Sequence, residues 1–269
     1  MKRKTWFWAL TPVAVALSLY GCGNGSDSDL AVDNNAQSCS VVSGTGSAVV
    51  VGSGLPGDPA APEAASGYRL GYKAKQSSNY MVVANTPLAT KAGCDVLKAG
   101  GTAVDAAVAV QAVLGLVEPQ SSTIAGSAFM MYYDAANKKV VAYDGRETAP
   151  AAATGYYLAR QDQNNASSPA PVPSARRSGR SIGVPGVMRM LDMAHKEHGK
   201  LAWAPLFDEG IRLASSGYKI PGRMGDAIRT NAANLQLDAN AVAAYFNADG
   251  TPKTTGTVTT NLPYAQSLR

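Results

Sequence analysis

Residues 102–117 form a stretch that is apolar on nearly every side when it is wound as a helix. A helix that is apolar all round lies either in a membrane or between the layers of a protein. This stretch is shorter than the ~20 residues that a membrane span needs, and Asp105 and Gln111 also disfavour lipid. Thr102 and Asp105 have the spacing of a capping box, which places the helix start at Ala103. The sequence therefore predicts a helix buried at the centre of a layered domain.

The residues just before that helix predict a strand and another helix. The run Met-Val-Val-Ala at residues 81–84 is typical of a short buried strand. A helix follows it, with Thr86 as N-cap and Pro87 at the first helical position. Gly100 and Gly101 are expected to end this helix shortly before the buried one begins.

Beyond the buried helix, the sequence predicts a hairpin and several more helices. Residues 128–133 and 139–143 are apolar and aromatic, and the polar residues 134–138 between them form the loop. Apolar residues at helical spacing predict later helices that begin near Pro185, Pro205, Met224 and Asn261. Strands beside a buried helix, followed by several helices, indicate a layered α+β domain rather than a sandwich or a bundle.

The first 21 residues have the features of an export signal. A basic start at residues 1–4 precedes an uncharged apolar run at residues 6–20. Leu-Tyr-Gly-Cys at residues 19–22 resembles the bacterial lipobox, in which the cysteine, here Cys22, is acylated and becomes the new N-terminus. Ordinary signal-peptidase cleavage, with Cys22 incidental, is the alternative. The lipobox interpretation predicts an exported lipoprotein, periplasmic or on the cell surface, and Gly23 favours the outer membrane by the same resemblance.

Residues 22–67 are rich in Gly, Ser and Pro and predict a flexible tether. Inside them, residues 52–57 match the spacing of a dinucleotide-binding loop, but the prolines that follow block the helix which such a site needs. The formal net charge is +5, and removal of the three cations in the signal leaves +2. The sequence therefore predicts no nucleotide site and no nucleic-acid partner.

The number and spacing of the cysteines and histidines do not indicate a metal site. With Cys22 acylated, Cys39 and Cys94 remain, and they form one possible disulfide in an oxidising compartment. The favoured interpretation is instead that Cys94 is a small buried residue and that Cys39 is unpaired. His195 and His198 lie near a predicted helix end, where the helix dipole explains them better than metal binding does. No cofactor motif is apparent.

Four blocks in order resemble the γ-glutamyltranspeptidase family, and together they span most of the chain after the tether. They are residues 81–123, FMMYYD at 129–134, DGRETAP at 144–150 and SIGVPGV at 181–187. The resemblance implies that residues 68–269 are the N-terminal part of the family's large subunit. The implied fold is a four-layer αββα sandwich of the N-terminal-nucleophile hydrolase type, of which this chain builds a portion.

The resemblance also implies a precursor that cuts itself. Its nucleophile would be the threonine that begins the small subunit, beyond Arg269, so no catalytic residue is predicted within these residues. The 269 residues by themselves are expected to be inactive and poorly stable. Thr260 is not predicted to be the nucleophile, because only nine residues follow it.

Two residues of the DGRETAP block are the candidate substrate-binding residues. Arg146 matches the family arginine that holds the α-carboxylate of a γ-glutamyl donor such as glutathione, and Glu147 matches the acidic residue beside it, which would orient the arginine. A planar guanidinium suits this task because it binds a carboxylate through two parallel bonds. A surface ion pair for Arg146 and a solvated carboxylate for Glu147 are the alternatives. The implied acceptors are water, amino acids and peptides.

Two other functions remain open alongside this one. The chain fits a non-catalytic lipoprotein module that keeps part of the fold, or an amide acylase of the same superfamily, although Arg146 argues against the acylase. One departure from the family is the run at residues 123–129, Thr-Ile-Ala-Gly-Ser-Ala-Phe, which has fewer glycines than the family's GIGGGGF. We therefore expect altered packing and weaker or divergent activity. The basic run at residues 176–180 is expected to be a solvated loop, with a phosphate or lipid-headgroup contact as the alternative.

Overall fold

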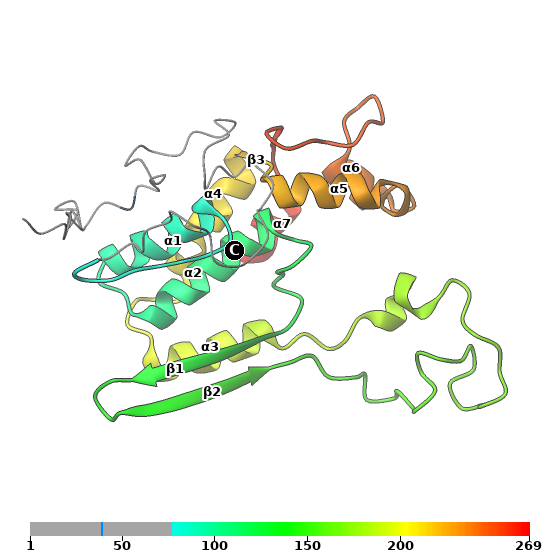
Figure 1. Cartoon of the computed structure of the whole chain (residues 1–269), viewed down its shortest axis with the longest axis horizontal. Coiled ribbons are helices and arrows are strands. Elements are labelled where there is room, and N and C mark those ends of the chain that lie inside the picture. Colours follow the sequence, from blue (N-terminus) through cyan, green and yellow to red (C-terminus); the bar gives the residue numbers. More distant parts are fainter. Residues whose placement is uncertain (1–38, 40–76) are drawn as a thin grey trace, which may run out of the picture.

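The computed structural model describes Cys39 and residues 77–269. The predicted signal at residues 1–21 and its Cys22 lie outside the described residues, as does all of the predicted tether except Cys39. Helices and two small antiparallel sheets make up the described chain (Figure 1). The helices are α1 (Pro87–Lys98), α2 (Ala103–Val117), α3 (Val187–His198), α4 (Asp208–Ser216), α5 (Gly222–Leu235), α6 (Ala239–Tyr245) and α7 (Leu262–Leu268). The strands are β1 (Ala128–Asp134), β2 (Lys139–Gly145), β3 (Tyr218–Lys219) and β4 (Val258–Thr259), and the 3-10 turns are η1 (Ala175–Arg177), η2 (Gly179–Ser181) and η3 (Ala204–Phe207).

Helices α1 and α2 begin at the predicted residues and with the predicted caps. The Thr86 hydroxyl accepts the backbone N–H of Ala89 at 3.3 Å, and α1 starts at Pro87. At the start of α2, the Thr102 hydroxyl accepts the N–H of Asp105 at 3.2 Å, and the Asp105 carboxylate accepts the N–H of Thr102 at 2.7 Å. Both caps satisfy donors that a helix start leaves without partners. These local predictions are confirmed.

Helix α2 lies at the centre of the described domain, as its apolar sequence predicts. One side packs with α1, α4, α5 and α7, in what we call the helix cluster. The opposite side packs with the hairpin, α3 and η3, in what we call the hairpin cluster. The buried α2 residues of the helix cluster are Ala109, Val113, Leu116 and Val117, and those of the hairpin cluster are Val104, Val108 and Ala112. A helix covered on two sides needs no polar stripe.

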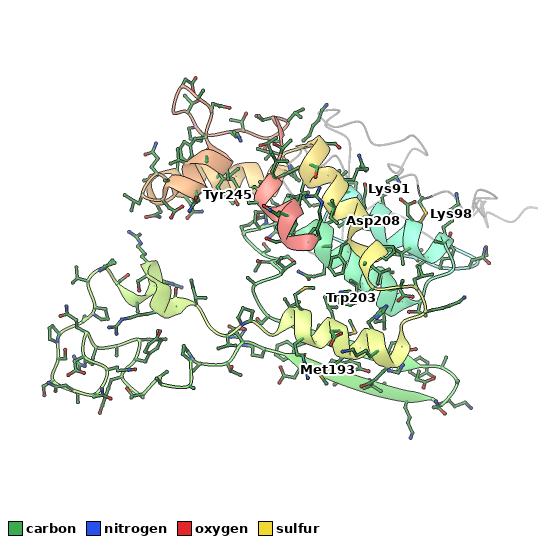
Figure 2. The ribbon with its side chains drawn as sticks, turned by 180° about the vertical axis from the view of Figure 1, so that it is seen from behind. Lys91, Lys98, Met193, Trp203, Asp208 and Tyr245 are labelled. Atoms are coloured by element: carbon green, nitrogen blue, oxygen red, sulfur yellow. A yellow bond between two sulfur atoms is a disulfide. The ribbon has the colours of Figure 1, made fainter. Side chains whose placement is uncertain are left out.

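Strands β1 and β2 form the predicted hairpin. They pair antiparallel, with Ala128 opposite Gly145 and Asp134 opposite Lys139. Helix α3 lies along this hairpin (Figures 1 and 2). The inner side chains, including Tyr143, belong to the hairpin cluster. The outer face exposes a row of large apolar side chains: Phe129, Met131, Tyr133 and Val140.

The later helices confirm most of the predicted pattern, and the structure adds elements that were not predicted. Helices α3, α5 and α7 lie where helices were predicted, while Pro205 falls in η3, which leads directly into α4. The Trp203 ring, labelled in Figure 2, lies edge-on to the rings of His195 and Phe207, with centroids 5.1 Å from each. Helix α6 and strands β3 and β4 were not predicted. Asp238 caps α6 by accepting the N–H of Ala241 at 2.9 Å, which is a signal that the sequence does contain.

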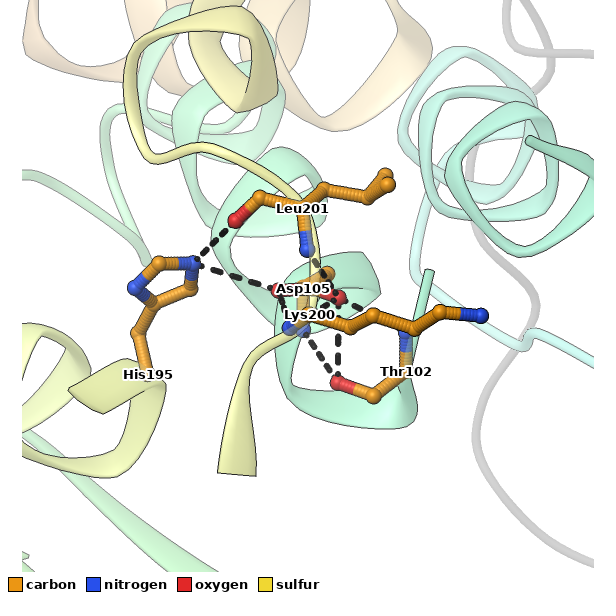
Figure 3. Close-up of polar contacts among 5 residues, drawn as sticks. All are labelled: Thr102, Asp105, His195, Lys200 and Leu201. Carbon is orange, nitrogen blue, oxygen red and sulfur yellow. Dashed lines mark hydrogen bonds and ion pairs between the residues drawn. The ribbon is translucent and has the colours of Figure 1, made fainter. Parts of the chain in front are cut away.

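Asp105 also ties α2 to the end of α3, which the sequence did not predict. Its carboxylate is fully buried and accepts the backbone N–H groups of Lys200 and Leu201 at 3.1 and 3.3 Å (Figure 3). His195 lies beside it, with its Nε2 atom 3.3 Å from the carboxylate and 3.0 Å from the carbonyl oxygen of Leu201. The predicted capping residue is therefore also a tertiary anchor. His195 therefore contacts this anchor, in addition to lying near the end of α3 as predicted.

A second buried carboxylate ties the end of α2 to the start of α5. Glu118 is 1% exposed, and its Oε2 atom lies 3.0 Å from the guanidinium of Arg223. Gln120 donates to the same oxygen at 2.8 Å, and Arg223 also donates to Ser121 at 3.2 Å. A buried carboxylate requires such partners. The block at residues 118–122 therefore joins two parts of the helix cluster.

Two sequence predictions are wrong. Residues 81–84 do not form a strand, and Val83 is 84% exposed, because no strand among the described residues pairs with this segment. Cys39 and Cys94 are paired: a disulfide joins them, with their Cα atoms 5.5 Å apart. The sequence alone left this pairing open, because it depends on where Cys39 lies relative to α1 in the folded chain.

Among the described helices, none combines the length and the apolarity that a membrane crossing requires.

Candidate active-site segment

Arg146 and Glu147 lie directly after β2, where the hairpin ends. The Asp144 carboxylate accepts the backbone N–H of Arg146 at 2.8 Å and so turns the chain at this point. The Arg146 side chain is 61% exposed, whereas the Glu147 side chain is 35% exposed. The two charged groups are 3.3 Å apart. An exposed pair of this kind adds little to stability. Because the Arg146 side chain is largely exposed, its guanidinium is accessible to a ligand.

Three segments that are far apart in the sequence meet around this pair. Thr148 and Val184 form a short antiparallel bridge through hydrogen bonds of 2.8 and 3.3 Å. The N–H groups of Gly186 and Val187 both donate to the carbonyl oxygen of Gly126, at 3.0 and 3.2 Å. The segment before β1, the segment after β2 and the segment before α3 are therefore fixed to one another by backbone bonds. Two of these segments lie in blocks that carry the family resemblance, residues 144–150 and 181–187.

Glycines allow this close approach. A Cβ atom at Gly183 would lie 2.6 Å from Cγ of Glu147 and 2.9 Å from its Cβ. At Gly145, a Cβ atom would lie 2.7 Å from the Cβ of Met190 on α3. Glycine is the residue that permits backbones and side chains to pack at such distances. Because Gly145 and Gly183 have no side chains, the end of β2 can lie against α3, and the Glu147 side chain can lie against residue 183.

The Glu147 carboxylate is held in its charged form. Hydrogen bonding from the Ser127 side chain lowers its pKa below the usual value, and the backbone N–H of Glu147 and the positive charge of Arg146 act in the same direction. Near neutral pH the site therefore presents an ionised carboxylate beside a permanent cation. This arrangement can bind a carboxylate ligand through the guanidinium, with the Glu147 carboxylate 3.3 Å from that guanidinium.

The connection from β2 to α3 is folded back on itself by one arginine. Arg180 donates to the backbone carbonyl groups of Tyr157, Arg160 and Gln161 at 2.9, 2.7 and 2.7 Å. The basic run at 176–180 is thus only partly the predicted solvated loop. Arg176 and Arg177 are exposed, but Arg180 is half-buried and structural.

The remaining candidates from the sequence lie away from Arg146. The Thr259 hydroxyl accepts a hydrogen bond from Nζ of Lys253 at 2.9 Å, and Thr260 beside it is exposed. His198 stacks on Tyr132 of β1, with ring centroids 4.1 Å apart. Within residues 77–269 and Cys39, no group of three or more ligand-type side chains is placed to hold a metal ion. Cys22 is outside the described residues.

The family model described as gamma-glutamyltranspeptidase matches residues 89–269. This chain belongs to the gamma-glutamyltranspeptidase family. Among curated relatives, glutathione hydrolase 3 of Arabidopsis thaliana is 37% identical over 194 residues, which are 72% of this chain and 29% of the relative. The glutathione hydrolase proenzyme of Bacillus subtilis (strain 168) is 37% identical over 174 residues, which are 64% of this chain and 28% of the relative. The chain therefore spans less than a third of the length of these two relatives.

The fold resembles solved members of the same family. The crystal structure of Helicobacter pylori gamma-glutamyltranspeptidase matches with a TM-score of 0.66 and 26% identity, over 73% of this chain and 54% of that chain. This likeness, together with the helices and strands described above, confirms the predicted α+β fold class as part of an N-terminal-nucleophile hydrolase fold. The gamma-glutamyltranspeptidase family domain covers nearly all of the described residues.

The sequence alone named Arg146 and Glu147 as candidate residues and missed the residues that lie beside Glu147. It placed Arg146 and Glu147 together at a strand end, and the structure puts them there. It did not identify Ser127 or Gly183 as neighbours of Glu147. Ser127 lies in a different segment of the chain, and no local pattern links it to Glu147. Nothing local in the sequence points to Gly183.

Proposed function

We propose that this chain is the N-terminal, donor-recognising part of an exported γ-glutamyltransferase and glutathione hydrolase. Such an enzyme cleaves the γ-glutamyl amide of glutathione and related compounds and passes the γ-glutamyl group to water, an amino acid or a peptide. Family membership and relatives named glutathione hydrolase support the reaction. The exposed guanidinium of Arg146 is the single observation that carries the part assigned to this chain.

The chemistry of the donor explains why an arginine suits this position. A γ-glutamyl group carries a free α-carboxylate well away from the amide that is cut. The Arg146 guanidinium projects from a rigid hairpin end and is oriented by Glu147, so it can hold that carboxylate by two parallel charge-assisted bonds. Positioning one end of the donor presents its amide to the nucleophile in a defined geometry.

The chemical step belongs to a second segment in this proposal. The nucleophile is the threonine that becomes the N-terminus of the small subunit after the precursor cuts itself, and its own amino group is the base. The word "proenzyme" in the name of the Bacillus subtilis relative supports a processed precursor. The small subunit is thus the obligatory partner of the residues described above, and the 269 residues by themselves are inactive in this proposal.

Export and lipid anchoring are further parts of the proposal. Residues 1–21 are the signal, Cys22 carries the lipid, residues 22–67 are the tether, and the enzyme faces the periplasm or the cell surface, with the outer membrane favoured. The disulfide between Cys39 and Cys94 supports an oxidising compartment, because such bonds persist outside the cytosol. Metabolic labelling with an alkyne fatty acid tests the anchor: the label is expected on the native protein and absent from Cys22→Ala. Labelling of Cys22→Ala, or none of the native protein, would contradict the anchor.

A donor assay with the complete gene product tests the function. The native protein is expected to release p-nitroaniline from γ-glutamyl-p-nitroanilide, and Arg146→Lys to raise KM by about 10- to 100-fold, because a point charge loses the two-bond fork. Arg229→Lys is the matched control, since Arg229 is also exposed and lies 3.4 Å from a carboxylate, that of Asp226 on α5. Arg229→Lys is expected to leave KM unchanged.

The assay also separates the alternatives. Release of chromophore by the native protein with an unchanged KM in Arg146→Lys would remove Arg146 from donor recognition. Hydrolysis of bulky amides that lack an α-carboxylate, without release from the γ-glutamyl donor, would favour the acylase. If the native protein shows neither activity, the result would favour a non-catalytic module.

A further inference from the structure

Asp144, near the end of β2, has a side chain that folds back onto the backbone of the candidate site. It is exposed, lies opposite Phe129 in the hairpin register, and stands two residues before Arg146. Its Oδ1 atom accepts the backbone N–H of Arg146 at 2.8 Å. A bond of this kind, from an aspartate side chain to the backbone two residues further on, is an Asx turn. Asp144 therefore contacts the backbone of the proposed donor-binding residue directly.

The backbone N–H of Arg146 has no acceptor in the hairpin ladder. The last pair of that ladder joins Ala128 to Gly145. Among the described residues, no backbone carbonyl group accepts the N–H of Arg146, and its acceptor is the Asp144 carboxylate. Backbone donors are strong hydrogen-bonding groups that folded chains pair. The Asx turn thus supplies, from a side chain, the bond that the ladder no longer provides.

The chain is held on both sides of Arg146. Before it, Gly145 packs so closely on α3 that a Cβ atom at this glycine would lie 2.7 Å from a side-chain atom of that helix. After it, Thr148 is bridged to Val184 by hydrogen bonds of 2.8 and 3.3 Å. The two residues between these fixed points form a short arc. The Asx turn fixes the start of this arc, and with it the direction in which the Arg146 side chain leaves the backbone.

The Asp144 bond goes to the backbone of Arg146, whereas the guanidinium has a different acidic partner. In the described chain, the carboxylate that pairs with this guanidinium is that of Glu147, at 3.3 Å. Asp144 and Arg146 are both exposed and flank the buried Gly145, so their side chains leave the same face of the hairpin end. Aspartate and asparagine form Asx turns, and the longer glutamate does not. Residue 144 therefore needs a short side chain with an oxygen acceptor.

We infer that Asp144 is a positioning residue for donor recognition: its Asx turn sets the direction in which Arg146 presents its guanidinium to the donor α-carboxylate. This inference rests on the proposed function. Asp144 acts through the backbone of Arg146 and touches neither the donor nor the nucleophile in this account. The oxygen acceptor of Asp144 is what the site requires, and its negative charge is not.

Three variants of the complete gene product separate the turn from the charge. Asp144→Asn keeps an oxygen acceptor and is expected to keep the KM for γ-glutamyl-p-nitroanilide within about twofold of the native value. Asp144→Ala removes the acceptor and is expected to raise KM about three- to tenfold, with kcat within about twofold. Asp144→Glu keeps the charge but loses the turn. We expect it to raise KM at least as much as Asp144→Ala, because its longer acidic side chain also competes with the donor for the guanidinium.

Inhibition by L-glutamate measures recognition without the chemical step. Because free glutamate carries the same α-carboxylate as the donor, its inhibition constant is expected to rise with KM in Asp144→Ala and to stay near native in Asp144→Asn. Asp162→Ala is the matched control, because Asp162 is also exposed and accepts the backbone N–H of Asn164, two residues on, at 3.0 Å. This variant should change neither constant. If Asp144→Ala fails to fold, Asp144→Asn and Asp144→Glu carry the test.

The outcomes are distinct. With an active native protein, a native KM in Asp144→Ala or in Asp144→Glu would overturn the role of Asp144 and leave the proposed function intact. Equal rises of KM in Asp144→Asn and Asp144→Ala would overturn it too, because the oxygen acceptor would then not be the cause. A loss confined to kcat would also overturn it, since orienting Arg146 acts on binding of the donor. No turnover of the γ-glutamyl donor by the native protein would contradict the proposed function, and this inference with it.

Discussion

The two sides of helix α2 differ in how completely they are enclosed. On the helix-cluster side, α1, α4, α5 and α7 surround α2, and buried side chains fill the space between them. On the other side, the hairpin covers α3 with one face only and presents Phe129, Met131, Tyr133 and Val140 outward. The candidate site begins where this half-covered hairpin ends. The comparison indicates that stability is concentrated around α2, while the proposed recognition groups lie on an element held from one side.

The largest expected effect is at the anchor of α2. Asp105→Ala removes a buried carboxylate that accepts N–H groups from Thr102, Lys200 and Leu201, and it should lower the free energy of unfolding by about 3–5 kcal/mol. Asp134→Ala is the hairpin counterpart, because Asp134 also accepts three hydrogen bonds, but in an exposed turn. We expect Asp134→Ala to lower the free energy of unfolding by about 1 kcal/mol or less. Thermal and urea unfolding of the complete gene product measures both, and equal losses would contradict the comparison.

A glycine inside α2 should give the next largest effect. A Cβ atom at Gly115 would collide with the hydroxyl of Tyr264, which donates to the carbonyl of Ala112 at 2.8 Å. Gly115→Ala is therefore expected to destabilise the protein by about 1–3 kcal/mol, despite the better helix propensity of alanine. Gly155→Ala in the connection has no atom within 4 Å of the new Cβ and should be nearly neutral. A neutral Gly115→Ala would show that α2 is less tightly enclosed than described.

The outer face of the hairpin should tolerate polar substitution. Met131 is 70% exposed, so Met131→Thr is expected to change the free energy of unfolding of the 269-residue chain by about 0.5 kcal/mol or less. Val141→Thr, on the inner face next to the hairpin cluster, should cost about 1–2 kcal/mol. Denaturant titrations of the two variants compare the faces directly. A large loss in Met131→Thr would mean that the outer face is covered in solution.

A pH dependence of stability is expected on the inner face of the hairpin. Burial and the bonded carboxylate of Glu197 raise the pKa of Tyr143 to about 12. Because the unfolded pKa is about 10, the stabilisation from the neutral phenol is complete below pH ~10 and is lost as the pH rises towards 12. As the pH rises from about 10 to about 12, the free energy of unfolding of Tyr143→Phe should therefore fall less than that of the native protein. Parallel curves for the two proteins would contradict the raised pKa.

Local rules predicted the elements of this fold better than they predicted their connections. Thr86, Thr102 and Asp105 act within a few residues of their helix starts, so the sequence placed α1 and α2 correctly. The bonds from Asp105 to Lys200 and Leu201 cross about a hundred residues, and no local pattern encodes them. The prediction of a strand at residues 81–84 was wrong for a related reason, because an apolar run forms a strand only when another strand pairs with it.

The candidate site follows the same division. Arg146 and Glu147 were predicted because they are neighbours in one block of the chain. Ser127 and Gly183 belong to segments that meet Glu147 only after the hairpin closes and α3 packs against it. Their contribution is geometric, so it became visible only in the folded chain.

The most direct test of the account is a crystal structure of the complete gene product with glutamate bound. The account predicts that the α-carboxylate of the ligand lies within hydrogen-bonding distance of the Arg146 guanidinium, with Glu147 on its other side. A bound glutamate that leaves the Arg146 side chain in bulk solvent would contradict the central claim.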